Sequence, residues 1–275
     1  MAHVIDGVEL ARERVESMRS FVASLPKTPS LIALASEPDI PTQQFLKIKK
    51  RVAERIGVSM VTKSVAANFH EAKQALATAC ADADGVVVQL PFPESVDMDA
   101  LLSHLPAHAD PDCLGTHASA LLERHESPIL PPVISAVRAM CIRYGIVPRG
   151  KRVVVVGQGR LVGAPGARWF EEEGAEVVRV TKSSTDLPEI LLEADILLLG
   201  AGAPGLVLSE HIREGVVIFD AGTSETGGKV VGDAEPACQE KASFFTPVPG
   251  GIGPLAVAEL FANLLRLRFD YRDEK

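Results

Sequence analysis

Short apolar runs alternate with segments of helical spacing along both halves of the chain. The runs that predict strands are 30–35, 59–63, 85–90, 153–156, 176–180, 195–199 and 216–220. The spacing of apolar positions predicts helices at 8–24, 42–56, 70–81, 131–150, 187–193 and 255–268. Strands that alternate with helices are typical of parallel sheets, so this pattern predicts an α/β fold throughout.

The pattern divides into two α/β domains, the second of which is a Rossmann-type parallel sheet. We expect a substrate or catalytic domain at 1–143, completed by a C-terminal helix at 254–275, and an NAD(P)-binding domain at 144–253. The helix at 131–150 is expected to cross between them. The final helix has no strand left to pair with, so it is expected to pack back onto the first domain. The last residues, 271–275, are expected to fray.

The composition is typical of a folded protein without a membrane span. A chain of 275 residues with 47% hydrophobic content can bury a sizeable core. It has no apolar run of the roughly 18 residues that a membrane span needs, and its first residues lack a basic region followed by an apolar one. These features predict a cytoplasmic protein that does not contact membranes.

Charge and metal-ligand spacing exclude two further classes of function. With 36 acidic and 28 basic residues, the net charge of −8 argues against general nucleic-acid binding. The four cysteines are widely spaced and the seven histidines show no ligand spacing, so we expect neither disulfides nor a metal site.

Lys49 stands at an unusual position in the helix predicted at 42–56. At about 100° per residue it falls within an apolar stripe formed by Phe45, Val52 and Ile56. Burial and neighbouring cations both lower the pKa of a lysine, which can then act as a general base near neutral pH. The alternative is a lysine that snorkels to the edge of the stripe.

Polar residues that could bind a ligand follow the strand at 85–90. Gln89 lies at the carboxyl end of that strand, where open α/β sheets bind ligands, and Pro91 and Pro93 stiffen the turn after it. The alternative is a glutamine that hydrogen-bonds to loop backbone. Asp110 and Asp112, by themselves, indicate only a turn or a helix cap.

A glycine-containing turn follows the strand predicted at 153–156, which consists of four valines, and precedes a helical pattern. Gly157, Gly159 and Gly163 depart by one position from the usual dinucleotide-binding spacing, but backbone donors and a helix N-terminus there suit a pyrophosphate. The next strand ends near Lys182 and Ser183, without the acidic residue that binds the ribose of NAD. This favours NADP, unless Lys182 is an ordinary surface lysine.

Residues 246–254 form a loop rich in proline and glycine. Three prolines limit its freedom, and three glycines allow close approach and positive φ, so the loop can offer its backbone to a flat ligand. Pro254 suits the first turn of the helix that follows. The alternative is a tight connection between two domains.

Together these segments resemble the bifunctional methylenetetrahydrofolate dehydrogenase/methenyltetrahydrofolate cyclohydrolase family nearly from end to end. The segment 85–93 looks like the family's Val-Gln-Leu-Pro-x-Pro element, and 246–254 looks like its Pro-Val-Pro-Gly-Gly-Val-Gly-Pro signature. The family's Tyr-x-x-x-Lys motif falls on Phe45 and Lys49. The resemblance implies that Lys49 is the catalytic lysine, that Gln89 assists it and that Asp112 binds the pterin.

The resemblance also implies two ligand sites, with a folate cleft between the domains. The residues expected to bind folate, besides the three just named, are Phe45, Leu90, Pro91, Gly251, Ile252, Gly253 and Pro254. Those expected to bind NADP, with NAD as the alternative, are Gly157, Gln158, Gly159, Arg160, Val162, Gly163, Lys182, Ser183 and Thr223. Tetrahydrofolate would carry the substrate carbon, and the family implies a homodimer.

Several positions depart from the family pattern. Phe45 keeps an aromatic face but lacks the tyrosine hydroxyl, and the segment 131–136 retains only one proline of the family's Pro-Cys-Thr-Pro-x-Gly. The main hypothesis is NADP-dependent oxidation of 5,10-methylenetetrahydrofolate to the methenyl compound, with hydrolysis to 10-formyltetrahydrofolate. The alternatives are a dehydrogenase without cyclohydrolase activity and a folate- or NADP-binding protein without turnover. A shikimate-dehydrogenase-like protein explains neither 89–93 nor 247–254.

Overall fold

The computed structural model describes residues 2–36, 38, 40–227 and 229–272, and it divides into two compact units. Unit 1 comprises Met1–Ala11 and Val133–Ala256, and unit 2 comprises Arg12–Pro132 and Val257–Lys275. Each unit has its own parallel sheet, which confirms the prediction of two α/β units. Residues 273–275, at the end of the expected C-terminal helix and frayed tail, lie outside the described residues.

Unit 2 is built on a three-stranded parallel sheet in the order β3-β2-β4. Its strands are β2 (Ser30–Ala35), β3 (Ser59–Ser64) and β4 (Gly85–Gln89). Its helices are α2 (Ile40–Ile56), α3 (Phe69–Asp82), α4 (Met98–Leu102), the short 3-10 helix η1 (Ala107–Ala109) and α5 (Thr116–Glu123). β2 and β4 are nearly continuous apolar runs because their side chains are buried, as is typical of a parallel sheet covered by helices.

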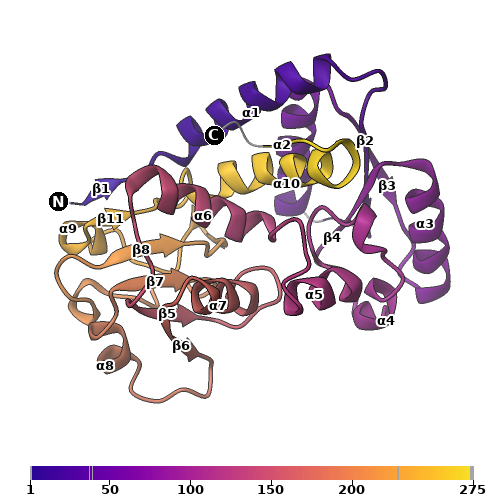
Figure 1. Ribbon diagram of the computed structural model, residues 1–275. Coiled ribbons are helices and arrows are strands. Elements are labelled where there is room, and N and C mark those ends of the chain that lie inside the picture. The colour runs from indigo at the N-terminus through magenta and orange to yellow at the C-terminus, as the bar shows by residue number, and fades with distance from the viewer. Residues whose placement is uncertain (1, 37, 39, 228, 273–275) are drawn as a thin grey trace. The chain divides into compact units, whose positions relative to one another are not determined.

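Unit 1 is built on a six-stranded parallel sheet in the order β1-β11-β8-β7-β5-β6, visible in Figure 1. Its strands are β1 (His3–Val4), β5 (Arg152–Val156), β6 (Glu176–Val180), β7 (Ile196–Leu199), β8 (Val217–Asp220) and β11 (Phe244–Phe245). Strand β5 lies between β6 and β7, so the connections diverge at β5. That divergence is the place where doubly wound sheets bind dinucleotides.

The remaining elements of unit 1 surround this sheet. They are α6 (Pro132–Tyr144), α7 (Gly163–Glu172), α8 (Leu187–Leu192), the 3-10 helix η2 (Ser209–His211), α9 (Cys238–Lys241) and an antiparallel hairpin of β9 (Ser224–Thr226) and β10 (Lys229–Val231). The expected helix at 131–150 ends at Tyr144, because Gly145 adopts a positive φ of 65°. β1 pairs with β11 of the larger sheet, whereas the sequence placed residues 1–143 in one domain.

Besides α6, whose first residue Pro132 belongs to unit 2, two helices contribute residues to both units, α1 (Gly7–Ala23) and α10 (Ile252–Phe269). From Val257 onward α10 belongs to unit 2, which agrees with the expectation that the last helix returns to the first domain. The expected fraying is wrong for Tyr271, which is only 6% exposed. Its ring lies 5.0 Å from that of Phe21, and its hydroxyl lies 3.0 Å from Ser17 Oγ.

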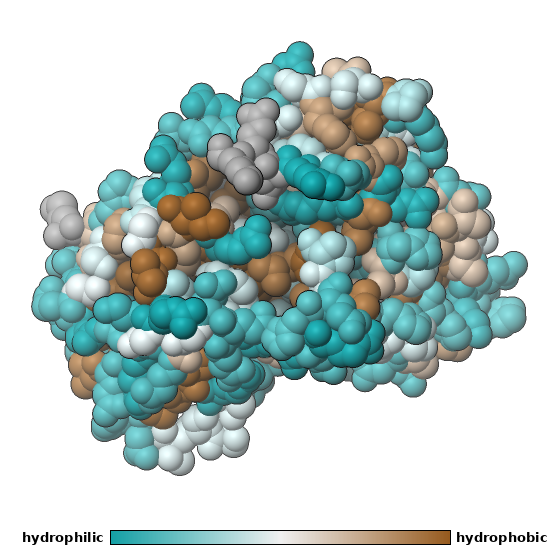
Figure 2. All heavy atoms as spheres, viewed as in Figure 1, coloured by the Kyte–Doolittle hydropathy of each residue, from teal (hydrophilic) through white to brown (hydrophobic). Residues whose placement is uncertain are grey.

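The surface is largely polar on the face shown in Figure 2, where hydrophobic residues form small separate groups among hydrophilic ones. Among the described residues, no helix is long and apolar enough to cross a membrane. The apolar residues gather instead in the cores of the two units. Val154 and Leu197 are fully buried in one of these cores, and Leu76 and Val86 are fully buried in the other.

Candidate active site

Lys49 lies on the buried face of α2, although its neighbours Lys47 and Lys50 are exposed. Its side chain is 5% exposed, and its Nζ donates a hydrogen bond of 2.9 Å to Gln89 Oε1. The ammonium also lies 5.0 Å from the centroid of the Phe45 ring. The lysine therefore remains inside the apolar stripe instead of reaching solvent.

The electrostatic environment of Lys49 combines burial with one opposite charge. Burial lowers the pKa of Lys49 below its ordinary value of 10.5, and the nearby carboxylate of Asp112 opposes that shift. Burial likewise raises the pKa of Asp112, and Lys49 opposes the rise. A lysine with a lowered pKa can exchange a proton with a bound ligand more readily than a solvated lysine.

Gln89 is the last residue of β4, as expected, and it links Lys49 to the turn that follows. Its Oε1 accepts from Lys49, and its Nε2 donates to the carbonyl oxygen of Leu90 at 2.8 Å. The amide orientation is thus determined at both ends. Leu90 precedes Pro91 through a cis peptide bond, and both residues are at least partly exposed beside Gln89.

Phe45 lies on the same side of α2 as Lys49, one turn earlier. It is 39% exposed even though its ring contacts the Lys49 ammonium. An exposed aromatic ring beside a buried amine can stack on a flat ligand. Phe45 has no hydroxyl to hydrogen-bond to that amine.

Asp112 stands in a tightly bent segment at 110–115. The buried carboxylate of Asp110 accepts hydrogen bonds from the backbone N–H groups of Leu114 and Gly115, at 3.2 and 2.7 Å. Burial raises the pKa of Asp110 to about 7. Cys113 adopts a positive φ of 54°. Asp110 is therefore a structural carboxylate that closes the turn, while Asp112 is only partly buried.

The proline- and glycine-rich loop packs against the start of α1 within unit 1. A Cβ atom added to Gly7 would come within 1.7 Å of the Gly251 carbonyl oxygen. Gly250 has a φ of 111°, and the Gly251 N–H donates to the Pro247 carbonyl oxygen at 2.7 Å. Gly251 is buried, whereas Gly253 is exposed with open space around its added Cβ. The loop is therefore exposed at Pro249 and Gly253 and buried between them at Gly251.

The two other loop residues expected to bind folate differ in accessibility. Ile252 is 2% exposed, and Pro254 in the first turn of α10 is half-buried. Pro254 therefore offers more surface to a ligand than Ile252 does.

The turn after β5 depends on glycine at two positions. Gly157 has a φ of 87°, and a Cβ atom added to Gly163 would lie 1.8 Å from the Gly157 carbonyl oxygen. Gly159 is exposed, with no atom within 4 Å of an added Cβ. The first N–H groups of α7 and this open stretch of backbone fit a pyrophosphate.

The other residues expected at the cofactor site lie in this turn or in the loops after β6 and β8. The Gln158 side chain donates to the carbonyl oxygens of Val155 and Gly157, so it stabilises the turn itself. Arg160 is exposed, and Val162 caps α7. The residues Lys182, Ser183 and Thr223 are exposed in loops that follow β6 and β8. The exposed Lys182 ammonium suits a ribose phosphate.

Two buried aspartates that no local sequence pattern indicated, Asp220 and Asp233, shape the neighbouring loops. Asp233 accepts hydrogen bonds from the backbone N–H groups of three consecutive residues, 201–203, after β7. Asp220 accepts from Gly222, Asp233 and Ala234, and burial raises its pKa to about 6. The sequence signal for these aspartates is a nearby glycine. An added Cβ at Gly222 would collide with Asp233, and an added Cβ at Gly232 would collide with the Asp220 carboxylate.

The structure thus groups the expected site residues by unit. Unit 2 contains Phe45, Lys49, Gln89, Leu90, Pro91 and Asp112. Unit 1 contains residues 251–254 and every residue expected at the cofactor site. Unit 2 therefore supplies the amine, amide and carboxylate, and unit 1 supplies backbone donors and exposed cations.

Comparison with known proteins gives one consistent result. A model of the family described as tetrahydrofolate dehydrogenase/cyclohydrolase, NAD(P)-binding domain, matches residues 131–270. The bifunctional protein FolD of Thermus thermophilus is 32% identical over 268 residues, covering 96% of this chain and 95% of that protein. The bifunctional FolD methylenetetrahydrofolate dehydrogenase/cyclohydrolase of Campylobacter jejuni has a TM-score of 0.93 at 27% identity, covering 98% and 99% of the two chains. A Trypanosoma brucei methylenetetrahydrofolate dehydrogenase-cyclohydrolase, solved with NADP and an inhibitor, has a TM-score of 0.90 at 30% identity, covering 97% of each chain.

Proposed function

Since the chain belongs to the tetrahydrofolate dehydrogenase/cyclohydrolase family, we propose that it oxidises 5,10-methylenetetrahydrofolate with NADP and hydrolyses the methenyl product to 10-formyltetrahydrofolate. The observation that carries this proposal is the buried Lys49, hydrogen-bonded to Gln89 and within the field of Asp112. A buried amine with a lowered pKa suits the proton transfers that hydrolysis requires.

The residues of unit 2 act on the folate in this proposal. The exposed ring of Phe45 stacks on the pterin, and Asp112 orients it by accepting hydrogen bonds from its amino and ring nitrogens. Lys49 takes a proton from the attacking water, and Gln89 keeps the Lys49 amine in place. Leu90 and Pro91 of the same unit add further folate contacts.

The residues of unit 1 bind the cofactor in this proposal. Backbone N–H groups at Gly157–Gly163 bind the pyrophosphate, and Lys182 with Ser183 binds the ribose phosphate of NADP. Arg160 and Thr223 contribute further contacts to the same ligand. NADP bound there would supply the hydride acceptor for oxidation of the methylene carbon. NAD would lack the phosphate that Lys182 is proposed to bind.

Mixing the purified protein with 5,10-methylenetetrahydrofolate and NADP tests the proposal directly. Absorbance reports the reduced cofactor, and acid-quenched samples report the methenyl compound. We expect reduced cofactor to form while the methenyl compound does not accumulate, because Lys49 supports hydrolysis of the methenyl compound. Ligand binding by calorimetry without any product from NADP or NAD would indicate a binding protein instead.

Phe45 motivates a second candidate, a dehydrogenase that has lost cyclohydrolase activity. In that case the methenyl compound would accumulate in step with the reduced cofactor. We expect Phe45→Tyr to raise the rate of hydrolysis by about tenfold, because a phenol would add a hydrogen bond beside the buried Lys49 amine. The measurement is the decay of added methenyltetrahydrofolate. Phe45→Leu is the comparison: it adds no hydroxyl and removes the ring proposed to stack on the pterin, so it should not raise the rate. An unchanged rate in Phe45→Tyr would contradict a role for that hydroxyl.

We also propose that the protein is a cytoplasmic homodimer. Two large apolar side chains of unit 1 support an association surface there, since Ile142 is 74% exposed and Val147 is 64% exposed. Light scattering coupled to size-exclusion chromatography measures the mass in solution. A mass near 29.3 kDa at micromolar concentration would indicate a monomer.

A further inference from the structure

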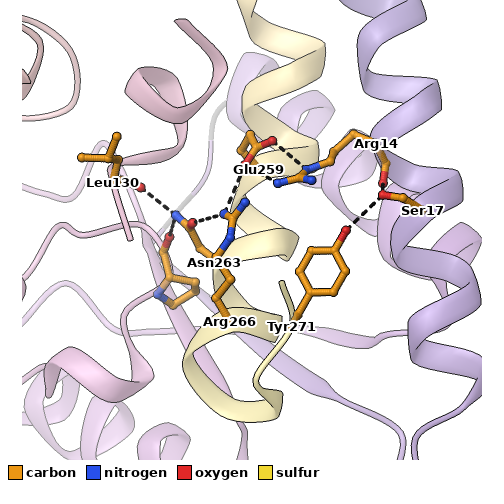
Figure 3. Close-up of polar contacts among 8 residues, drawn as sticks. Arg14, Ser17, Leu130, Glu259, Asn263, Arg266 and Tyr271 are labelled. Atoms are coloured by element: carbon orange, nitrogen blue, oxygen red, sulfur yellow. Dashed lines mark hydrogen bonds and ion pairs between the residues drawn. The ribbon is translucent and has the colours of Figure 1, made fainter. Parts of the chain in front are cut away.

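The C-terminal helix carries a buried amide that contacts the segment bearing Asp112. Asn263 of α10 is fully buried, and its Nδ2 donates to the carbonyl oxygens of Pro111 at 2.9 Å and Leu130 at 2.8 Å (Figure 3). Both hydrogens of its amide are therefore used on backbone. Pro111 immediately precedes Asp112, so Asn263 holds the peptide group from which Asp112 extends.

A chain of ion pairs determines the orientation of this amide. Arg266 donates to Asn263 Oδ1 at 2.9 Å and pairs with Glu259 at 3.3 Å. Arg14 of α1 pairs with the other side of Glu259 at 2.8 Å (Figure 3). Because Arg266 only donates, Asn263 must turn its oxygen toward Arg266 and its nitrogen toward the two carbonyl groups. The network therefore prevents the amide from flipping.

The turn that carries Asp112 is held from both sides. The Asp110 carboxylate closes the turn by accepting from the N–H groups of Leu114 and Gly115. Within the same turn, Asn263 donates to the carbonyl oxygen of Pro111. An Asp112 carboxylate on a freer peptide would sample more positions relative to Lys49. Small displacements of catalytic groups have large effects on rate.

We propose that Asn263 is a positioning residue for Asp112: it fixes the Pro111–Asp112 peptide so that the Asp112 carboxylate is presented to Lys49 and to the folate. This inference rests on the proposed function for its kinetic consequences, but its structural content does not depend on turnover. Among the described residues, the Asn263 side chain hydrogen-bonds to the backbone of Pro111 and Leu130 and to Arg266. It acts on the reaction through Asp112.

A double-mutant cycle tests the proposal. Asn263→Leu keeps the branched shape and removes both donors, and we expect it to lower kcat/KM for 5,10-methylenetetrahydrofolate by about tenfold or more. The Kd for NADP should stay at the parental value. In an Asp112→Ala background the same substitution should change kcat/KM by less than about twofold, because the group that it positions is gone. Equal effects in both backgrounds would overturn the proposal.

A matched control separates positioning from general loosening of the helix. Arg14→Gln weakens the far end of the same network and leaves the donations of Asn263 to Pro111 and Leu130 intact. We expect it to lower the midpoint of urea unfolding while keeping kcat/KM. If Asn263→Leu does not fold, Arg266→Met releases the orientation of the amide and enters the same cycle. A parental kcat/KM in the folded Asn263 or Arg266 variant would also overturn the proposal.

A second readout is independent of catalysis. Among the described residues, Asp112 is the charged group that acts on Lys49, while its other close neighbours, Gln89 and Phe45, are neutral. Acetylation of Lys49 by acetic anhydride, followed by peptide mass spectrometry across a pH range, reports the pKa of its amine. Both Asn263→Leu and Asp112→Ala should shift that profile to lower pH, and the double variant should shift it no further than Asp112→Ala. An unshifted profile in Asn263→Leu would refute the positioning role, whether or not the parental protein shows turnover. Absence of turnover in the parental protein would refute only the proposed function.

Discussion

Replacing Lys49 with methionine is expected to slow hydrolysis of methenyltetrahydrofolate by about 10² to 10⁴-fold, the usual contribution of a positioned acid or base. Methionine fills similar space in the apolar stripe but has no amine to accept the proton of the attacking water. The Kd for NADP should stay unchanged, since the expected cofactor residues belong to unit 1 and Lys49 belongs to unit 2. Decay of the methenyl compound measures the rate, and calorimetry measures the cofactor.

The same helix supplies a control for this substitution. Lys50 is the next residue and is exposed, so Lys50→Met removes one positive charge without disturbing the site. It should hydrolyse the methenyl compound at the parental rate. Hydrolysis by Lys49→Met at the parental rate would exclude Lys49 as the base.

The rate of hydrolysis should depend on pH through the protonation state of the Lys49 amine. Only the neutral amine is a base, so hydrolysis by the parental protein should fall as the pH drops below the pKa of Lys49. Burial holds that pKa below 10.5, and Asp112 limits the shift. Asp112→Ala should therefore move the acid limb of the profile to lower pH.

Replacing Gly163 with alanine is expected to destabilise unit 1 by about 3 kcal/mol and to weaken NADP binding by more than about tenfold. The new Cβ would lie 1.8 Å from the Gly157 carbonyl oxygen. That oxygen belongs to backbone that is itself confined, because an added Cβ at Gly157 would come within 2.6 Å of the Gly200 carbonyl oxygen. The turn must therefore open, and the start of α7 must move away from β5. Urea unfolding and NADP calorimetry measure the two effects.

Gly159 provides the comparison within the same turn. An alanine there meets no atom within 4 Å, so Gly159→Ala should retain the parental unfolding midpoint. Any loss of NADP affinity in Gly159→Ala would then report the approach of the cofactor to the backbone. A parental unfolding midpoint in Gly163→Ala would contradict the packing argument.

Local sequence patterns predicted the longer strands of both sheets, β2 to β8, because burial imposes a simple spacing on the chain. The valines at 153–156 form β5, and the stripe through Phe45, Val52 and Ile56 correctly placed Lys49 on the buried side of α2. Gln89 was expected at a strand end and is the last residue of β4. These inferences needed only neighbours within a few residues, whose geometry the helix and strand periods determine.

Other features depend on contacts that no local pattern encodes. The hairpin of β9 and β10 and the short strand β11 were not predicted, and Tyr271 was expected to fray although it packs on Phe21. Asp233 acts on N–H groups about thirty positions earlier in the chain. Which backbone N–H groups a short polar segment will bond to is decided only when the sheet brings them near.

By itself, the sequence determined two α/β units, the buried lysine and the glycine turn after β5, because burial and glycine geometry act over a few residues. The tertiary structure alone decided which groups meet. Asn263 holds the carbonyl of Pro111 across 152 positions of sequence, and Gly7 accommodates the Gly251 carbonyl near the other end of the chain. Such pairs form because buried amides and carbonyl groups must find partners once water is excluded, and the partners available are those that folding brings near.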